Sequence, residues 1–237
     1  MNIISSIRNR FLKMFGDIKV FRFPFFILYD PGSYKVKGYE VRKVIESIRS
    51  GDIMIRGYSN YLDGYFIPGF FSHAGLYLGK TCKSDFTETE QTKDKFFEGS
   101  QVVIHSMAEG VFMEDVLSFC KCDYLVILRR NNKVEQDLNL EDAFKSIYKK
   151  ALGNLGKNYD FKFDFSEIGN LSCTELVFDC NSEFLNKYNV KLKQRWAYLK
   201  KREMLLPDDF VTDKFEIVFQ SASLSESQLK KILTLNT

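Results

Sequence analysis

Residues 71–79 read FSHAGLYLG, and this stretch carries the pattern that indicates the fold. The alternation from Ser72 to Gly79 is typical of a β-strand, with His73 near its start. Other short runs rich in β-branched and apolar residues predict further strands at 52–55, 102–105, 110–112 and 124–129. Because these strands are short and follow one another closely, we expect an antiparallel meander.

Helical patterns occur before, between and after these strands. Apolar residues at helical spacing predict helices over 41–48, over 140–153 behind a cap at Asn139, and from Ser172 onward. We expect a polar, solvated and mobile insertion at 80–101 and an extended aromatic segment at 159–165. The last part of the chain predicts a basic helical stretch at 191–204, a turn at Pro207-Asp208-Asp209 and a strand at 215–219. The fold class is therefore α+β, with helices packed on an antiparallel sheet.

The composition excludes several classes of protein. The chain has 237 residues, 45% of them apolar, which is enough to bury a core. Its 34 basic and 31 acidic residues nearly balance, so we expect no nucleic-acid partner. The five cysteines are odd in number and form no paired CxxC array, which argues against a disulfide framework and a four-cysteine zinc site. We predict no cofactor and no metal, and the composition leaves the oligomeric state open.

The first 39 residues form a separate N-terminal arm in this interpretation, followed by a hydrolase domain at 40–222 and a tail at 223–237. The apolar runs of the arm are too short to cross a bilayer, and we find no clear signal peptide. We therefore expect a cytoplasmic protein. The arm is either a packing segment or a basic amphipathic helix that makes peripheral contact with a membrane surface.

Ser172-Cys173-Thr174-Glu175 has the form of a helix capping box. This places Cys173 at the first helical position, where the positive end of the helix dipole favours a thiolate over a thiol. The other four cysteines lack this setting, and we interpret them as structural. Cys173 is therefore the candidate nucleophile.

A cysteine nucleophile needs a base, and the base needs an orienting group. His73 and His105 are the only histidines in the chain. If their strands are neighbours in one sheet, both rings project from the same face toward the start of the Cys173 helix. His73 is then the base and His105 the orienting residue. The competing interpretation is that each is a partly buried strand histidine without a catalytic role.

The segments FSHAGLYLG (71–79), VVIHS (102–106) with EGV (109–111), GKNYDFKFDF (156–165) and SCTELVF (172–178) resemble a known family. Together they are similar to the circularly permuted branch of the NlpC family of papain-like cysteine hydrolases, and to its YiiX-like members in particular. The order His73, His105, Cys173 is the permuted order. The likeness extends over about residues 40–220 and implies a papain-like fold with an antiparallel sheet or barrel packed against helices.

The resemblance implies a role for each matched residue. Cys173 corresponds to the nucleophile and His73 to the base. His105 occupies the third triad position, where YiiX-like members often have Glu, and this departure bears on the pH optimum. Tyr159 corresponds to a tyrosine that stands beside the nucleophile, although it is equally well explained as a core aromatic residue.

The substrate is less well defined by the sequence. The aromatic-rich loop 58–71 directly precedes His73, so Tyr58, Phe71 and Ser72 are candidates for substrate binding, with an apolar acyl pocket as one model. Core packing beneath the loop is the other. We predict a thiol-dependent hydrolase of amide or ester bonds that acts on a peptide, amide or acyl-lipid substrate through a Cys-His-His triad and an acyl-enzyme. The alternatives are a lipid acyltransferase or hydrolase of the same superfamily, a non-catalytic binding module, and, last, a metal site.

Overall fold

The computed structural model describes residues 18–20, 27–29, 34–59, 69–131, 140–166, 169–197 and 200–236. Within the predicted N-terminal arm, β1 (Ile18–Val20) and β2 (Ile27–Tyr29) pair as an antiparallel ribbon. Three predictions fall outside the described residues: the amphipathic helix near the N-terminus, most of the aromatic loop, and the helix cap at Asn139.

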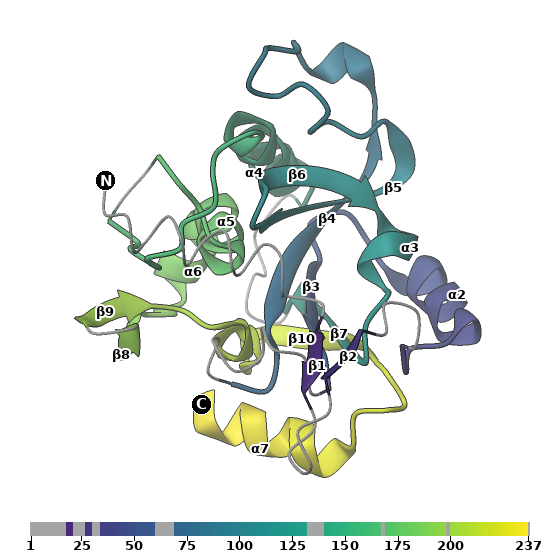
Figure 1. Cartoon of the computed structure of the whole chain (residues 1–237), viewed down its shortest axis with the longest axis vertical. Coiled ribbons are helices and arrows are strands. Elements are labelled where there is room, and N and C mark those ends of the chain that lie inside the picture. The colour runs from purple at the N-terminus through teal and green to yellow at the C-terminus, as the bar shows by residue number, and fades with distance from the viewer. Residues whose placement is uncertain are drawn as a thin grey trace.

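One six-stranded antiparallel sheet organises the domain, in the order β10-β7-β3-β4-β5-β6. The strands β3 to β6 form the predicted meander, after which β7 returns beside β3 and β10 pairs on its outer side (Figure 1). Their bounds are β3 Ile53–Gly57, β4 His73–Thr81, β5 Gly99–Met107, β6 Gly110–Asp115, β7 Tyr124–Arg130 and β10 Phe215–Gln220.

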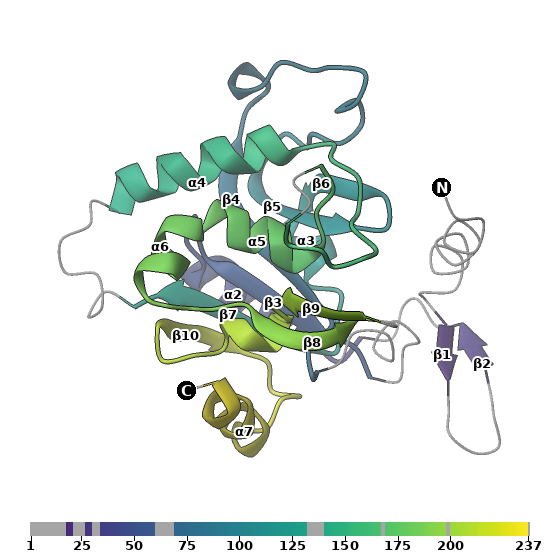
Figure 2. The same ribbon diagram turned by 90° about the vertical axis from the view of Figure 1, so that its left-hand side faces the viewer.

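Helices cover both faces of this sheet. Figures 1 and 2 show α4 (Leu140–Asn154), α5 (Cys173–Cys180) and α6 (Ser182–Lys187) on one side, and α2 (Gly38–Ser47) and α3 (Val116–Phe119) on the other. Two short 3₁₀ helices, η2 (Lys83–Asp85) and η3 (Pro207–Phe210), lie in connecting segments. The arrangement confirms the predicted α+β class.

The alternation along β4 divides the core into two layers. Ala74, Leu76 and Leu78 belong to the cluster that packs against α4 and α5. Tyr77 belongs to the cluster with Phe119 of α3 on the opposite face. A one-residue shift of this strand would exchange the two sets of side chains, so the register is fixed by burial on both sides.

The segment 191–204 is not the predicted helix. It forms a hairpin of β8 (Lys193–Ala197) and β9 (Lys200–Met204), in which Arg195 lies opposite Arg202. Both guanidinium groups find acidic partners outside the hairpin, because Arg195 pairs with Asp209 and Arg202 with Asp164. Alternate side chains share a face in a strand but not in a helix, so these tertiary ion pairs favour the hairpin.

Two other expectations need correction, and the structure adds a helix to the predicted tail. The segment 159–165 is not extended, because it turns around the Asp160 carboxylate and Phe163 adopts a left-handed φ of 55°. The insertion 80–101 is only partly solvated, since the stacked rings of Phe86 and Phe96 pack against the core. The predicted tail contains α7 (Glu226–Asn236), whose apolar residues Leu229 and Ile232 are buried.

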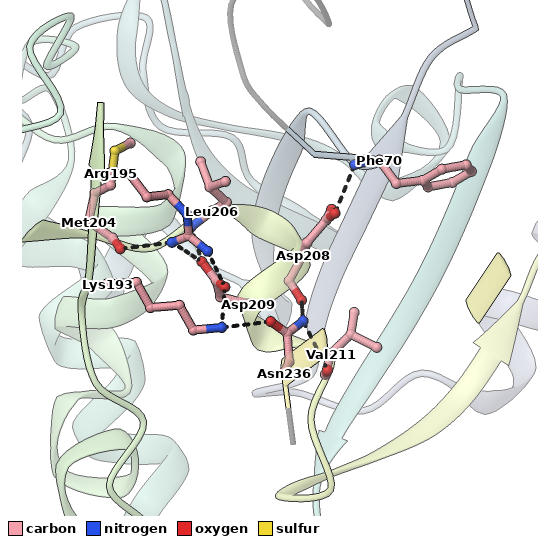
Figure 3. Close-up of polar contacts among 9 residues, drawn as sticks. All are labelled: Phe70, Lys193, Arg195, Met204, Leu206, Asp208, Asp209, Val211 and Asn236. Carbon is pink, nitrogen blue, oxygen red and sulfur yellow. Dashed lines mark hydrogen bonds and ion pairs between the residues drawn. The ribbon is translucent and has the colours of Figure 1, made fainter. Parts of the chain in front are cut away.

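The predicted turn at 207–209 is the centre of a polar cluster (Figure 3). The Asp208 carboxylate accepts hydrogen bonds from the backbone N–H groups of Phe70 and Phe71, both at 2.8 Å. Asn236 of α7 donates to the Asp208 carbonyl at 2.6 Å and accepts from Lys193 at 2.7 Å. The cluster therefore ties β8, η3 and α7 to the chain immediately before His73.

Gly75 provides a test of the close packing beneath the two histidines. A Cβ atom at this position would lie 2.6 Å from the Phe119 ring and 3.1 Å from Val103. We expect Gly75→Ala to lower the free energy of unfolding by about 1 to 3 kcal/mol in urea titrations. Gly153→Ala is the matched control, since nothing lies within 4 Å of its Cβ position in α4 and it should be neutral or slightly stabilising. Equal stabilities for the two variants would contradict this account.

Candidate active site

Cys173 lies at the first position of α5, as the sequence predicts. Ser172 is the N-cap residue, and its hydroxyl accepts a hydrogen bond from the Glu175 N–H at 3.4 Å. The Glu175 carboxylate in turn accepts from the Ser172 N–H at 2.6 Å. The capping box is thus confirmed, and it fixes the direction in which the helix presents its first residue.

The electrostatic state of Cys173 differs from the prediction. Burial, the largest cause, together with the Glu175 carboxylate raises the pKa of the thiol to about 11. The backbone N–H groups of Ala74 and Thr174 lower the pKa, but they do not compensate for desolvation. The expected thiolate is therefore wrong for the resting protein, in which residue 173 is a neutral thiol.

The two histidines form a hydrogen-bonded pair. His73 Nε2 lies 2.8 Å from His105 Nδ1, and the register places His105 of β5 opposite Gly75 of β4. Both rings are buried, and this burial, followed by the Arg56 charge, holds the pKa of each well below its usual value. At neutral pH the pair consequently consists of two neutral imidazoles.

The histidine rings and the helix that carries Cys173 lie on opposite faces of β4. The rings of His73 and His105 lie on the face that contacts Phe119 of α3, whereas α5 packs on the opposite face. Cys173 comes close to the N–H of Ala74, the residue that follows His73. In the described part of the chain no hydrogen bond joins the Cys173 sulfur to either ring. The rings share one face as predicted, but they do not engage the thiol in the resting structure.

Two charged residues that sequence reasoning missed complete this cluster. Arg56 of β3 lies opposite His73, is 5% exposed and donates to the Phe119 carbonyl at 3.0 Å. Glu114 of β6 places a carboxylate oxygen 3.3 Å from His105 Nε2 and 3.7 Å from Arg56. A charged residue inside an otherwise apolar strand is a signal that could have identified Arg56. Glu114 has no comparable signal.

The remaining predicted site residues lie in different surroundings. Tyr159 is half-buried, with its ring against Phe161 and Phe163. Tyr58 packs partly against the α3-side core, under the Arg56 guanidinium. Phe71 is 1% exposed and belongs to the main core, so it does not line an open acyl pocket in this structure.

Ser72 is buried, and its hydroxyl has no hydrogen-bond partner among the described residues. Cys120, Cys122 and Cys180 are buried, as Cys173 is, whereas Cys82 is partly exposed. Over the same described ranges, no group of three or more His, Cys, Asp or Glu side chains is arranged to hold a metal ion. None of the described helices has the length and hydropathy needed to cross a membrane.

A cysteine at the start of a helix, packed against an antiparallel sheet that carries a histidine pair, is the arrangement of the papain-like class of fold. The comparison with protein families gives the particular family. The model described as "permuted papain-like amidase enzyme, YaeF/YiiX, C92 family" matches residues 47–225, and the chain belongs to this family.

A solved structure shows the same fold. The chain is similar to a crystal structure described as metalloprotein YiiX of Escherichia coli O157:H7, with a TM-score of 0.52 and 15% identity. The similarity covers 74% of this chain and 98% of that one. A comparison with curated proteins finds no match. The expected permuted papain-like fold is thereby confirmed.

Glu175 gives a testable pH dependence of stability. Burial raises the pKa of its carboxyl to about 7 from 4.5, so the folded state binds a proton that the unfolded state releases above pH 4.5. The free energy of unfolding should therefore fall by about 3 kcal/mol, relative to Glu175→Gln, as the pH rises from about 4.5 through 7. Gln retains the capping geometry. Urea titrations at pH 5 and 8 measure this difference.

The control for this experiment is Glu183→Gln, which removes an exposed carboxylate from α6. Its pH dependence should parallel that of the wild type. If Glu175→Gln also parallels the wild type, the buried carboxyl is already ionised at low pH and the argument is wrong.

Proposed function

We propose that this protein is a cysteine amidase in which Cys173 is the nucleophile, His73 the base and His105 the third residue of the triad. The observation that carries the proposal is the 2.8 Å hydrogen bond between His73 and His105, at the strand start that Cys173 approaches. A hydrogen-bonded pair of imidazoles is the arrangement that a base and its orienting residue require. The family description supports amide bonds as the substrate class.

The resting charges favour general-base catalysis over a preformed ion pair. A thiol with a pKa of about 11 must lose its proton as it attacks, and the neutral imidazole of His73 can accept that proton once substrate binding has brought the two together. In the proposed sequence the sulfur of Cys173 bonds to the substrate carbonyl while His73 takes the thiol proton. His73 then gives that proton to the leaving amine, and a thioester remains on Cys173. His73 then deprotonates a water molecule, which attacks the thioester carbonyl. The C–S bond breaks, the acid product leaves and the proton on His73 returns to the Cys173 sulfur.

The start of α5 supplies partial positive charge, which complements the negative charge that develops on the substrate carbonyl oxygen. The N–H of Cys173 is among the first helical donors, which have no partner within the helix. A carbonyl oxygen that gains negative charge during attack is stabilised by such a donor and by the helix dipole. Because Cys173 is 2% exposed, substrate binding must first open the surroundings of the thiol.

The finer assignment of substrate is also part of the proposal. We favour a peptide or other amide, with an acyl ester or lipid as the alternative within the same mechanism. Contact of the N-terminal arm with a membrane remains a hypothesis from its basic amphipathic sequence. A non-catalytic module is the competing function, and the missing hydrogen bond between Cys173 and His73 is the observation in its favour.

Removal of the nucleophile tests the proposal directly. We expect Cys173→Ala and His73→Ala each to reduce amide turnover by about 1,000-fold or more, because each removes a group that acts in bond cleavage. Turnover is measured on a panel of acyl-aminocoumarin amides and the matching esters. Intact-mass spectrometry of the wild type should show the acyl group on Cys173 with a slowly hydrolysed substrate.

Cys82→Ala is the matched control, because Cys82 is partly exposed and follows β4 at the end opposite His73. It should retain full activity. Activity that persists in Cys173→Ala would exclude the mechanism. A wild type that turns over no member of the panel and forms no adduct would favour the binding module.

A further inference from the structure

We infer that Glu114 is a positioning residue that sets the tautomer of both histidines and thereby leaves Nδ1 of His73 as the proton acceptor for Cys173. The inference rests on the proposed cysteine hydrolase function and extends the triad by a fourth residue on β6. It is carried by the order of contacts that runs from His73 through His105 to Glu114.

The contacts form a continuous line across three strands. His73 Nε2 lies 2.8 Å from His105 Nδ1, and the other nitrogen of His105, Nε2, lies 3.3 Å from a Glu114 carboxylate oxygen. His105 is fully buried, and its Nε2 has no aligned hydrogen bond among the described residues. A buried N–H without an acceptor is costly, and a small rotation of Glu114 would supply one. Glu114 is the acidic side chain within ion-pair distance of that nitrogen.

The carboxylate decides which nitrogens carry protons. A neutral imidazole has one N–H donor and one acceptor nitrogen, and a carboxylate can only accept. His105 must therefore carry its proton on Nε2, facing Glu114, and its Nδ1 becomes an acceptor. His73 Nε2 then carries the proton that Nδ1 of His105 accepts. The basic lone pair of His73 is left on Nδ1, and the reverse tautomer would leave no base for the thiol.

Titratable groups lie around the pair on the elements packed against it. They are Arg56 on β3, Glu114 and Asp115 on β6, Cys120 and Lys121 after α3, and Cys173 on α5, of which Arg56 and Glu114 are the charged groups that approach the rings. Arg56 opposes protonation of both rings and also lies 3.7 Å from Glu114. When His73 accepts the thiol proton, Glu114 is the anion closest to the new positive charge on the pair. It thus stabilises the imidazolium that the reaction forms.

The tautomers can be measured on the wild-type protein without substrate. The chain has only two histidines, so ¹⁵N-detected long-range spectra contain two ring systems that can be assigned by His73→Ala. We expect both rings to be neutral and protonated on Nε2 at pH 7. A proton on Nδ1 of either ring overturns the inference, whatever the enzyme's substrate is.

The second experiment compares Glu114→Gln with Asp115→Asn. Both variants remove one negative charge from β6, but Asp115 caps α3 through the Leu117 N–H, a role that Asn also performs. We expect Glu114→Gln to lower kcat by about 10-fold or more with little change in KM. It should also move the acidic limb of kcat/KM to lower pH, since the imidazolium loses its counterion. Asp115→Asn should match the wild type in both.

The two proposals fail in distinguishable ways. If Cys173→Ala destroys activity but Glu114→Gln keeps the wild-type pH profile, the triad stands and the role of Glu114 is refuted. If Cys173→Ala remains active while both rings carry Nε2 protons, the network exists but the cysteine mechanism is wrong. Near-ultraviolet circular dichroism establishes that each variant is folded before its kinetics are compared.

Discussion

The pairing of β4 with β5, with Gly75 opposite His105, is the constraint on which the rest of the site depends. It places two rings on one face of the sheet, with His73 Nε2 and His105 Nδ1 2.8 Å apart. Because residue 75 has no side chain, Phe119 has room to pack beneath them. The opposite face of the same strand holds α5 through Ala74, Leu76 and Leu78. A single strand thus fixes both the histidine pair and the helix that carries Cys173, from opposite sides.

Burial, more than the helix dipole, sets the chemistry of this centre. Desolvation is the largest influence on the pKa of Cys173, His73 and His105, and in each case it disfavours the charged form. A neutral thiol and neutral imidazoles form no ion pair in the absence of substrate. In the proposed reaction, charge would develop only during bond cleavage. Arg56 and Glu114 would then interact electrostatically with that charge from β3 and β6. Such a resting state protects a cysteine from adventitious oxidation, because the reactive thiolate is not populated.

Features carried by short local patterns could be predicted from the sequence, and features created by long-range contacts could not. The capping box at Ser172, the strand at 73–81 and the meander follow from neighbouring residues, and the structure has them. The hairpin at 193–204 was mistaken for a helix because its register depends on Asp209 and Asp164, which no local pattern reveals. Glu114 was not predicted for the same reason, because only the pairing of β6 with β5 brings it close to His105. The thiolate expected at Cys173 was wrong because a capping motif does not reveal how deeply the thiol is buried.

The polar cluster around Asp208 has a consequence for how the site is assembled during synthesis. The backbone just before His73 is held by the Asp208 carboxylate, which lies 137 and 138 residues further along the chain, and Asn236 donates a hydrogen bond to the backbone carbonyl of the same aspartate. A ribosome-bound chain therefore lacks the anchor for β4 until η3 and α7 have emerged. The anchoring of the backbone before β4 is in this sense a late event of translation, which waits for Asp208 of η3.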